Sequence, residues 1–207
     1  MSGVITDYAS LQTSVGHWLA RGDLTTFIPA FIQNFEERFY RDPQNWGGFM
    51  EKALSGTVAS SVIATPSDYL GLKIAYVSGQ SLPPLKRISR EQLLARYPRS
   101  GLVGVYPQYI ARDISNFIFG PIPADGTVIS GTYFAKPALL RNAGGTWLIT
   151  NAPDMLLYGA LLEAEPFLKN DARLALWQAM YQNALDTYRA MNRDEADSGS
   201  APFAVAM

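Results

Sequence analysis

The sequence offers few side chains for catalysis, because His17 is its single histidine and cysteine is absent. A Ser-His-Asp triad would need His17 as its base, and no Gly-x-Ser-x-Gly turn supplies the nucleophile. Carboxylates are the remaining metal ligands, but the sequence has no Asp-x-Asp-x-Asp-Gly calcium loop. The Walker A and dinucleotide-binding glycine motifs are absent too. We therefore expect no catalytic site, no metal and no cofactor.

Paired carboxylates are a second chemical option, since glycoside hydrolysis needs only two of them. The candidates are Glu36 with Glu37, and Glu163 with Glu165. Helix residues one or two positions apart point in different directions, which favours solvated or ion-paired roles for these side chains. Glu163 or Glu165 could still act as a catalytic acid with partners elsewhere in the chain, and this alternative stays open.

Basic residues gather in one part of the chain, with Tyr97 and Tyr106 nearby. The cluster consists of Lys86, Arg87, Arg90, Arg96 and Arg99. A groove for single-stranded nucleic acid combines more positive charge with aromatic platforms. The pattern favours an ordinary solvated face, and a weak surface for DNA or for a partner protein is the alternative.

The composition predicts a folded protein, since 48% of the 207 residues are hydrophobic and 17% are charged. The net charge of -1 provides no overall attraction to nucleic acid or to an anionic membrane. The first residues do not resemble a secretory signal, and no apolar run approaches the roughly 20 residues that span a bilayer. We expect a soluble protein made in a cytoplasm, without a membrane partner.

The elements that would position these residues begin with two helices. Thr6 or Asp7 should cap the first helix, and Gly22 should take the left-handed position at its end. Asp23 should cap a second helix that follows directly. The apolar stripe of the second helix consists of phenylalanines spaced four residues apart, namely Phe27, Phe31, Phe35 and Phe39.

The middle of the chain contains short β-type runs separated by Gly, Pro and Ser. We expect strands near residues 49–55, 57–63, 70–77, 84–88, 105–112, 117–120 and 127–135, and one helix after Ser89. Residues 110–122 read as a hairpin that turns near Ser115, and alternation in the last strand places Ile129 and Tyr133 on one face. This pattern is typical of a small antiparallel sandwich or barrel.

The last third of the chain is helical again. Asn151 can cap a helix with Pro153 in its first turn, and Pro166 should kink or end it. A second helix then carries a heptad-like seam, formed by Leu174, Trp177, Tyr181, Ala184, Tyr188 and Met191. The linker-like end of the chain finishes on apolar residues and reads either as a disordered terminus or as an arm that orders on a partner.

These elements predict an α+β fold. Residues 1–45 and 149–194 would each supply a helix pair to one bundle, residues 46–148 would form an inserted antiparallel β-rich region, and residues 195–207 would form a flexible arm. Aromatic helix surface is abundant and catalytic groups are scarce, which favours assembly over catalysis.

The last third also carries a distinctive series of residues: Thr150 to Asp154, Leu157 to Ala164, Pro166 to Leu168, Asp171, Arg173, Leu174, Trp177 and Tyr181. This series resembles the C-terminal signature of the head-to-tail adaptor proteins of tailed bacteriophages, especially short-tailed ones. Tyr133 to Pro137 resembles the last strand of that family, with Phe134 in place of a second tyrosine. Residues of the family's first two helices are matched by Tyr8, Leu11, Trp18, Asp23, Leu24, Ile28 to Ile32, Glu37 and Arg38.

The resemblance implies a structural protein of the virion, located at the head–tail interface and assembled in the host cytoplasm. Adaptors of this kind form a ring, typically of twelve copies, under the portal. The ring extends the DNA channel and provides a platform for the tail. The implied partners are further copies of the chain, the portal protein and the tail nozzle or tube protein. DNA would pass through without sequence-specific binding.

Two sets of residues are expected to make the contacts of such an adaptor. Packing within the bundle and between subunits is expected of Phe31, Phe35, Leu157, Leu161, Trp177, Tyr181 and Tyr188. A docking arm for the portal or the tail is expected of Phe203, Val205 and Met207. A tail-associated cell-wall-degrading enzyme and a generic binding module are the alternative functions.

Overall fold

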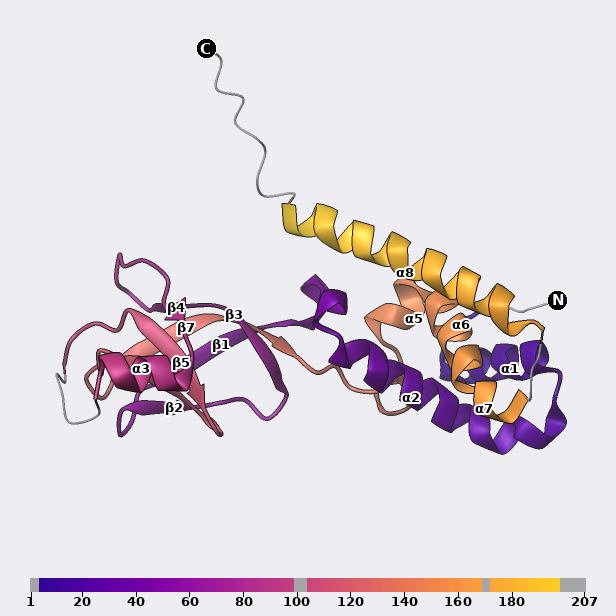
Figure 1. Ribbon diagram of the computed structural model, residues 1–207, viewed down its shortest axis with the longest axis horizontal. Coiled ribbons are helices and arrows are strands. Elements are labelled where there is room, and N and C mark those ends of the chain that lie inside the picture. The colour runs from indigo at the N-terminus through magenta and orange to yellow at the C-terminus, as the bar shows by residue number, and fades with distance from the viewer. Residues whose placement is uncertain (1–3, 99–103, 169–171, 198–207) are drawn as a thin grey trace, which may run out of the picture. The chain divides into compact units, whose positions relative to one another are not determined.

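A computed structural model describes residues 4–98, 104–168 and 172–197, which form two compact units (Figure 1). The helical unit comprises Met1–Phe49 and Pro137–Met207, and the β unit comprises Met50–Lys136. Helices and strands are thus segregated along the chain, which confirms the predicted α+β class. Residues 46–49 and 137–148, which the sequence analysis grouped with the β-rich region, fall in the helical unit.

The helical unit is built from α-helices of very different lengths and from short 3₁₀ segments. Its elements are α1 (Tyr8–Leu19), η1 (Gly22–Phe27), α2 (Ile28–Arg41), η2 (Pro43–Asn45), α4 (Leu140–Ala143), α5 (Trp147–Asn151), α6 (Pro153–Glu163), α7 (Glu165–Leu168) and α8 (Leu174–Asp197). The segment η3 (Gly48–Met50) leads into the first strand.

The ends of the first helix are only partly as predicted. Asp7 caps α1 and accepts a hydrogen bond from the Ser10 N–H at 2.8 Å, while the Ser10 hydroxyl accepts one from the Asp7 N–H. The prediction that Gly22 takes the left-handed position is wrong, because Ala20 takes it, with a φ of 53°. Gly22 opens η1 instead, so α2 begins at Ile28 rather than directly after Asp23.

The helix α6 is the centre of the helical unit, because most of its circumference is buried. Its buried residues are Met155, Leu156, Leu157, Gly159, Ala160 and Leu161, whereas Asp154 is exposed. A helix with so broad an apolar surface must be covered by neighbours, and α1, α2 and α8 all pack against it. Gly159 permits the close approach of α2, since a Cβ at this position would overlap the Phe35 ring.

The β unit contains two open sheets and one helix. Its elements are β1 (Glu51–Thr57), β2 (Val62–Ala64), β3 (Tyr69–Val77), β4 (Lys86–Arg87), α3 (Arg90–Arg96), β5 (Tyr109–Asp113), β6 (Asn116–Gly120) and β7 (Val128–Ala135). One sheet has the order β1-β7-β3 and the other the order β2-β6-β5-β4. The pairings are antiparallel except for the short parallel contact of β4 with β5. The sheets do not close, which excludes the barrel alternative.

A shared core lies between the two sheets. Ile129 and Tyr133 of β7 contribute to this core from one sheet, as the alternation predicted, and Ile110 and Phe117 contribute from the other. The helix α3 covers the opposite face of the second sheet, where Leu93 packs with neighbouring strand residues. Because α3 packs on this face of the sheet, the helix holds a fixed place over β5 and β6.

One carboxylate is buried in the helical unit. Glu36 on α2 is 1% exposed, and its two carboxylate oxygens accept hydrogen bonds from the Leu140 N–H at 3.0 and 3.2 Å. It therefore supplies hydrogen-bond acceptors to the first turn of α4, where backbone N–H groups lack partners within the helix. Glu36 thus connects α2 to the start of α4 through hydrogen bonds.

Burial raises the pKa of Glu36 to about 7. The Leu140 N–H and the Arg141 guanidinium of α4 oppose this rise, and Glu37 on α2 adds to it. The hydroxyls of Tyr8 on α1 and Tyr40 on α2 interact with the same carboxylate, and both have raised pKa values, with burial as the largest cause. The fold therefore favours the protonated form of Glu36 up to about neutral pH.

This burial predicts a pH-dependent stability that Glu36→Gln should remove. The pKa of Glu36 is higher in the folded than in the unfolded chain. Its contribution to the free energy of unfolding is therefore complete below pH 4.5 and is lost as pH rises through about 7. The amide keeps an acceptor for Leu140 and carries no charge. We expect the variant to gain on the order of 3 kcal/mol over the wild type at pH 8 and almost nothing near pH 4.5. Urea unfolding across this range measures the difference.

Glu37→Gln is the matched control, because Glu37 is the neighbouring residue and is only half-buried. It should keep most of the pH dependence of unfolding, because burial is the largest cause of the raised Glu36 pKa and the charge of Glu37 is a smaller one. A Glu36→Gln protein that keeps the wild-type pH dependence would show that another group is responsible.

Candidate interaction surfaces

The residues proposed for catalysis have other roles or lie on the surface. His17 is exposed on α1, and Glu165 is exposed on α7. Glu163 lies 2.9 Å from the Arg38 guanidinium and forms an ion pair with it. Over the described ranges, no group of three or more His, Cys, Asp or Glu side chains is placed to hold a metal ion. None of the helices in these ranges is long and apolar enough to cross a membrane.

The residues expected to pack the bundle lie mostly in its interior. Exposure is at most 5% for Phe31, Phe35, Leu157, Leu161, Trp177 and Tyr188, and Tyr181 is half-buried. The rings of Phe35 and Tyr181 meet edge to face at 5.6 Å, and those of Phe39 and Tyr188 do so at 5.3 Å. These side chains are therefore occupied within one chain.

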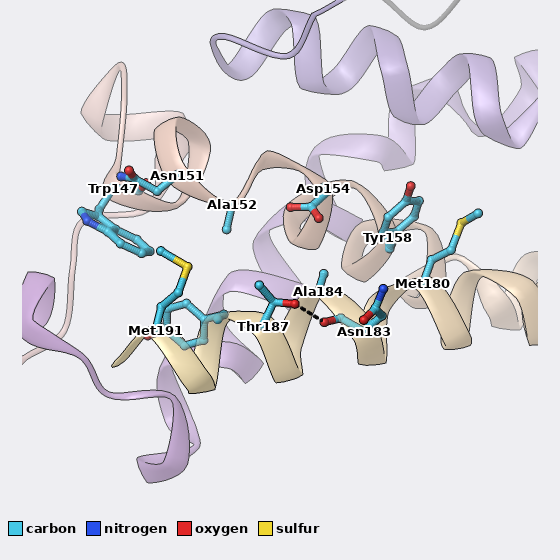
Figure 2. Close-up of a pocket in the computed structure, with 11 residues that line it drawn as sticks. Trp147, Asn151, Ala152, Asp154, Tyr158, Met180, Asn183, Ala184, Thr187 and Met191 are labelled. Atoms are coloured by element: carbon cyan, nitrogen blue, oxygen red, sulfur yellow. Dashed lines mark hydrogen bonds between the residues drawn. The ribbon is translucent and has the colours of Figure 1, made fainter. Parts of the chain in front are cut away.

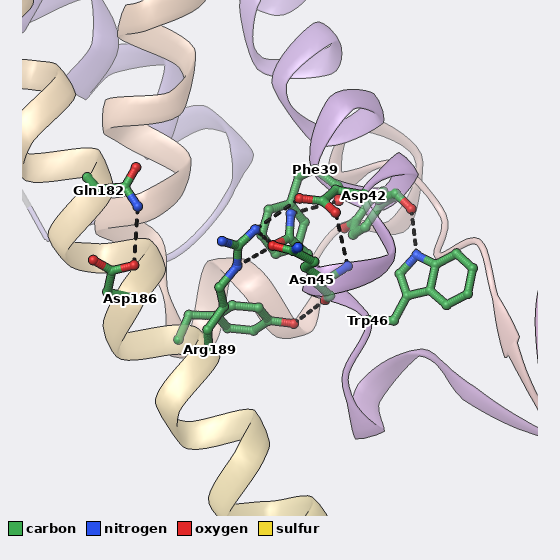
Figure 3. A network of polar contacts seen from close by, with 10 residues as sticks. Phe39, Asp42, Asn45, Trp46, Gln182, Asp186 and Arg189 are labelled. Carbon is green, nitrogen blue, oxygen red and sulfur yellow. Dashed lines mark hydrogen bonds and ion pairs between the residues drawn. The ribbon is translucent and has the colours of Figure 1, made fainter.

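A polar network attaches α8 to the segment that follows α2 (Figure 3). The Arg189 Nη2 donates to Asp42 Oδ2 at 2.9 Å and to Asn45 Oδ1 at 2.8 Å. The Arg189 Nε donates to the same Asn45 oxygen at 3.0 Å, and the Tyr188 hydroxyl donates to the Asn45 carbonyl. Asn45 is buried, and its amide also donates to the Phe39 carbonyl at 3.1 Å. The network fixes the middle of α8 against the end of α2.

Sequence reasoning missed this network. Tyr188 was placed on the buried seam, but Arg189, Asp42 and Asn45 carried no signal. The hydrogen-bonded residues lie far apart in the chain: Arg189 is 144 positions from Asn45 and 147 positions from Asp42. The feature that indicates a structural role for Asn45 is its burial directly after a helix. This burial is visible only in the folded chain.

A groove of about 300 Å³ runs between α8 and the α5–α6 segment (Figure 2). On the α5–α6 side it is lined by Trp147, Asn151, Ala152, Asp154 and Tyr158, and on the α8 side by Met180, Asn183, Ala184, Thr187, Tyr188 and Met191. Asp154 is the one charged side chain in this lining. Aromatic and methionine side chains of this kind are enriched in the cores of protein interfaces.

The side of α8 that lines the groove is uncharged over about four turns. This side carries Met180, Thr187 and Met191 of the lining, together with Leu176 one turn before it, at spacings of four and seven residues. Leu176 and Met191 are each 53% exposed. The prediction that Met191 belongs to the buried seam is therefore wrong, and its side chain is part of the exposed side. We call these four residues the groove face of α8.

The predicted arm residues Phe203, Val205 and Met207 lie outside the described residues, as does Arg99 of the basic cluster. Their roles stay predictions.

A model of the family described as SU10 adaptor protein matches residues 6–206. The chain belongs to the SU10 adaptor protein family. This membership confirms the resemblance to phage head-to-tail adaptors that was read from the C-terminal and N-terminal helices. No curated protein matches the chain.

The family determines what kind of protein this is. The chain is a structural adaptor protein of a bacteriophage, and its place is the virion, where adaptors interact with portal and tail components. Proteins of this kind are not typically enzymes. The surfaces that matter for this adaptor are therefore those that meet other proteins.

The network of Figure 3 predicts that Arg189→Ala destabilises the adaptor. The change removes three hydrogen bonds, one of them in an ion pair, and leaves the Asn45 oxygen without those donors. We expect a loss of about 2 kcal/mol in the free energy of unfolding, measured by urea titration.

Arg193→Ala provides the control one turn further along α8. Arg193 is exposed and donates only to the Arg189 carbonyl of its own helix, so its loss should change stability by less than about 0.5 kcal/mol. Equal effects of the two changes would contradict a specific role for the network.

Proposed function

We propose that this adaptor forms a closed ring beneath the portal, extends the DNA channel and offers the tail nozzle or tube a platform. Twelve copies are the number that the resemblance implies. The helical unit would meet the portal and neighbouring copies, and the β unit would lie toward the tail. The family supports the adaptor role, and the surfaces of the helical unit support the contacts between copies.

The groove face of α8 is the observation that carries the contact between copies. An exposed leucine and an exposed methionine lie four turns apart on a side without charge, next to a groove lined by Trp147 and Tyr158. Scattered apolar side chains need no explanation, but an aligned set beside a groove is typical of an interaction site. The buried seam of α8 is already used within the chain, so this second side is available.

A ring places further demands on such a surface. A closed ring needs a heterologous contact, in which one patch of a copy meets a different patch of the next. The groove and the groove face of α8 would form one of these patches. The only charged side chain of the lining, Asp154, would restrict the partner to a surface without an opposing carboxylate.

Native mass spectrometry of the adaptor, alone and mixed with portal rings, tests the ring. The wild type should give a ring-sized mass in at least one of the two samples. Leu176→Glu combined with Met191→Glu should leave a folded monomer in both, because two buried carboxylates at an interface lack partners. Ala175→Glu combined with Gln178→Glu adds the same charge at exposed α8 positions outside the groove lining, and should assemble like the wild type.

Each outcome has a clear meaning for this proposal. A wild-type monomer that ignores the portal would overturn the ring. A ring formed equally well by the Leu176→Glu and Met191→Glu protein would overturn the groove face as its contact.

The end of the chain is the second element of the proposal, as a docking arm with Phe203, Val205 and Met207 as its apolar contacts. Truncation after Asp197 should leave the unfolding transition unchanged and weaken binding to portal rings, because it removes these three side chains and no described residue. Co-sedimentation with portal rings measures the binding. Wild-type binding by the truncated adaptor would exclude the arm.

A further inference from the structure

Charge is unevenly divided between the two units of the chain. The β unit contains nine Lys and Arg against five Asp and Glu, a formal net charge of +4. The helical unit contains eight Lys and Arg against thirteen Asp and Glu, a formal net charge of -5. The net charge of -1 for the whole chain hides this division. A polyanion would therefore be attracted to the β unit and not to the helical unit.

Within the β unit, exposed cations meet at Tyr109 on β5. Lys86 of β4 is paired in register with Tyr109. The Arg96 guanidinium of α3 lies over the Tyr109 ring, 5.4 Å from its centroid. Both cationic side chains are exposed. A planar guanidinium that stacks on an aromatic ring is held in place while its N–H groups stay available at the edge.

These two cations differ from others of the same unit in having no acidic neighbour bound to them. Lys52 lies 2.6 Å from Asp68, Lys73 lies 2.6 Å from Glu51, and Arg90 lies 2.8 Å from Asp113. Within the part of the chain that the structure describes, neither Lys86 nor Arg96 forms an ion pair. Their charges are therefore free to act on an external anion.

Neutral hydrogen-bond donors lie beside the cations. A hollow of about 250 Å³ is lined by Lys86, Tyr106, Gln108 and Tyr109, together with Leu82 and prolines. Tyr106 is 52% exposed, and Gln108 is exposed as well. Hydroxyl and amide donors next to Lys and Arg are the groups that commonly contact phosphate oxygens of DNA.

The ring of Tyr109, at the centre of this surface, does not favour recognition of unpaired bases. The Tyr109 ring already carries the Arg96 guanidinium and lies 5.9 Å from the ring of Tyr97. A base could stack on Tyr109 only by displacing these groups. The arrangement therefore suits a contact with the outside of a duplex, made through phosphates alone.

We propose that the surface formed by Lys86, Arg96, Tyr106, Gln108 and Tyr109 binds the phosphate backbone of double-stranded DNA without reading its sequence. This inference rests on the proposed function, in which the ring surrounds the path of duplex DNA. It adds a definite contact to a passage that the sequence analysis expected to occur without sequence-specific binding. Contacts with phosphates carry no base information and let a protein slide along DNA.

Fluorescence anisotropy with the full-length adaptor and a labelled mixed-sequence duplex of about 30 base pairs tests the proposal at roughly 50 to 200 mM salt. The wild type should bind, and its affinity should fall steeply as salt rises. Lys86→Gln combined with Arg96→Gln should weaken binding about tenfold at the lowest salt and reduce the slope of log affinity against log salt by about 2. A second duplex of unrelated sequence should bind equally.

Lys52→Gln combined with Lys73→Gln is the matched control, because it removes the same charge from the same unit at cations that are already ion-paired. It should retain most of the binding. Equal losses in the two double variants would overturn the site, since net charge alone would then explain the effect. Absence of binding to duplex by the wild type, or binding to polyglutamate instead, would overturn it in favour of an acidic protein partner.

The same proteins examined by native mass spectrometry separate this inference from the proposed function. A ring without affinity for duplex would overturn the DNA contact alone. Duplex binding by an adaptor that forms no ring would overturn the ring and leave the surface intact.

Discussion

The burial of α6 is the constraint on which the rest of the helical unit depends. A helix that is apolar over most of its surface has to be covered, and the chain covers it with α1 and α2 from its beginning and α8 from its end. Gly159 sets the distance of closest approach to Phe35. Because both ends of the chain are needed around α6, the β unit can only be an insertion. Its first and last strands pair, with Glu51 opposite Phe134, so the chain enters and leaves it at one place.

Periodicity predicted the elements well wherever one face of an element is buried. Phe35 on α2, and Ile129 and Tyr133 on β7, are buried as their spacing indicated. The heptad reading of α8 failed at its end for a geometric reason. An α-helix has 3.6 residues per turn, so a strict repeat of 3.5 drifts by about 20° per heptad. After more than two heptads the buried side has moved from Met191, which is exposed, to half-buried Asn192.

The contacts that position the surfaces were beyond sequence reasoning, because they join residues far apart in the chain. Glu36 and Leu140 are separated by 104 positions, and each residue alone looks ordinary. Buried polar groups need partners, but the sequence does not say which partner the fold will bring. The charge division was present in the sequence throughout. It became visible only when the unit boundaries at Met50 and Lys136 showed which charges belong together.

The proposed place in a DNA channel sets two requirements that would conflict if one surface served both. Contacts between proteins should be strong and specific, which calls for apolar side chains at the centre of an interface. Contacts with moving DNA should be weak and indifferent to sequence, which calls for exposed cations. The chain separates these chemistries. The uncharged groove face of α8 belongs to the acidic helical unit, whereas Lys86 and Arg96 belong to the basic β unit. Repulsion of phosphates by the helical unit would keep DNA away from the surfaces proposed to hold the ring together.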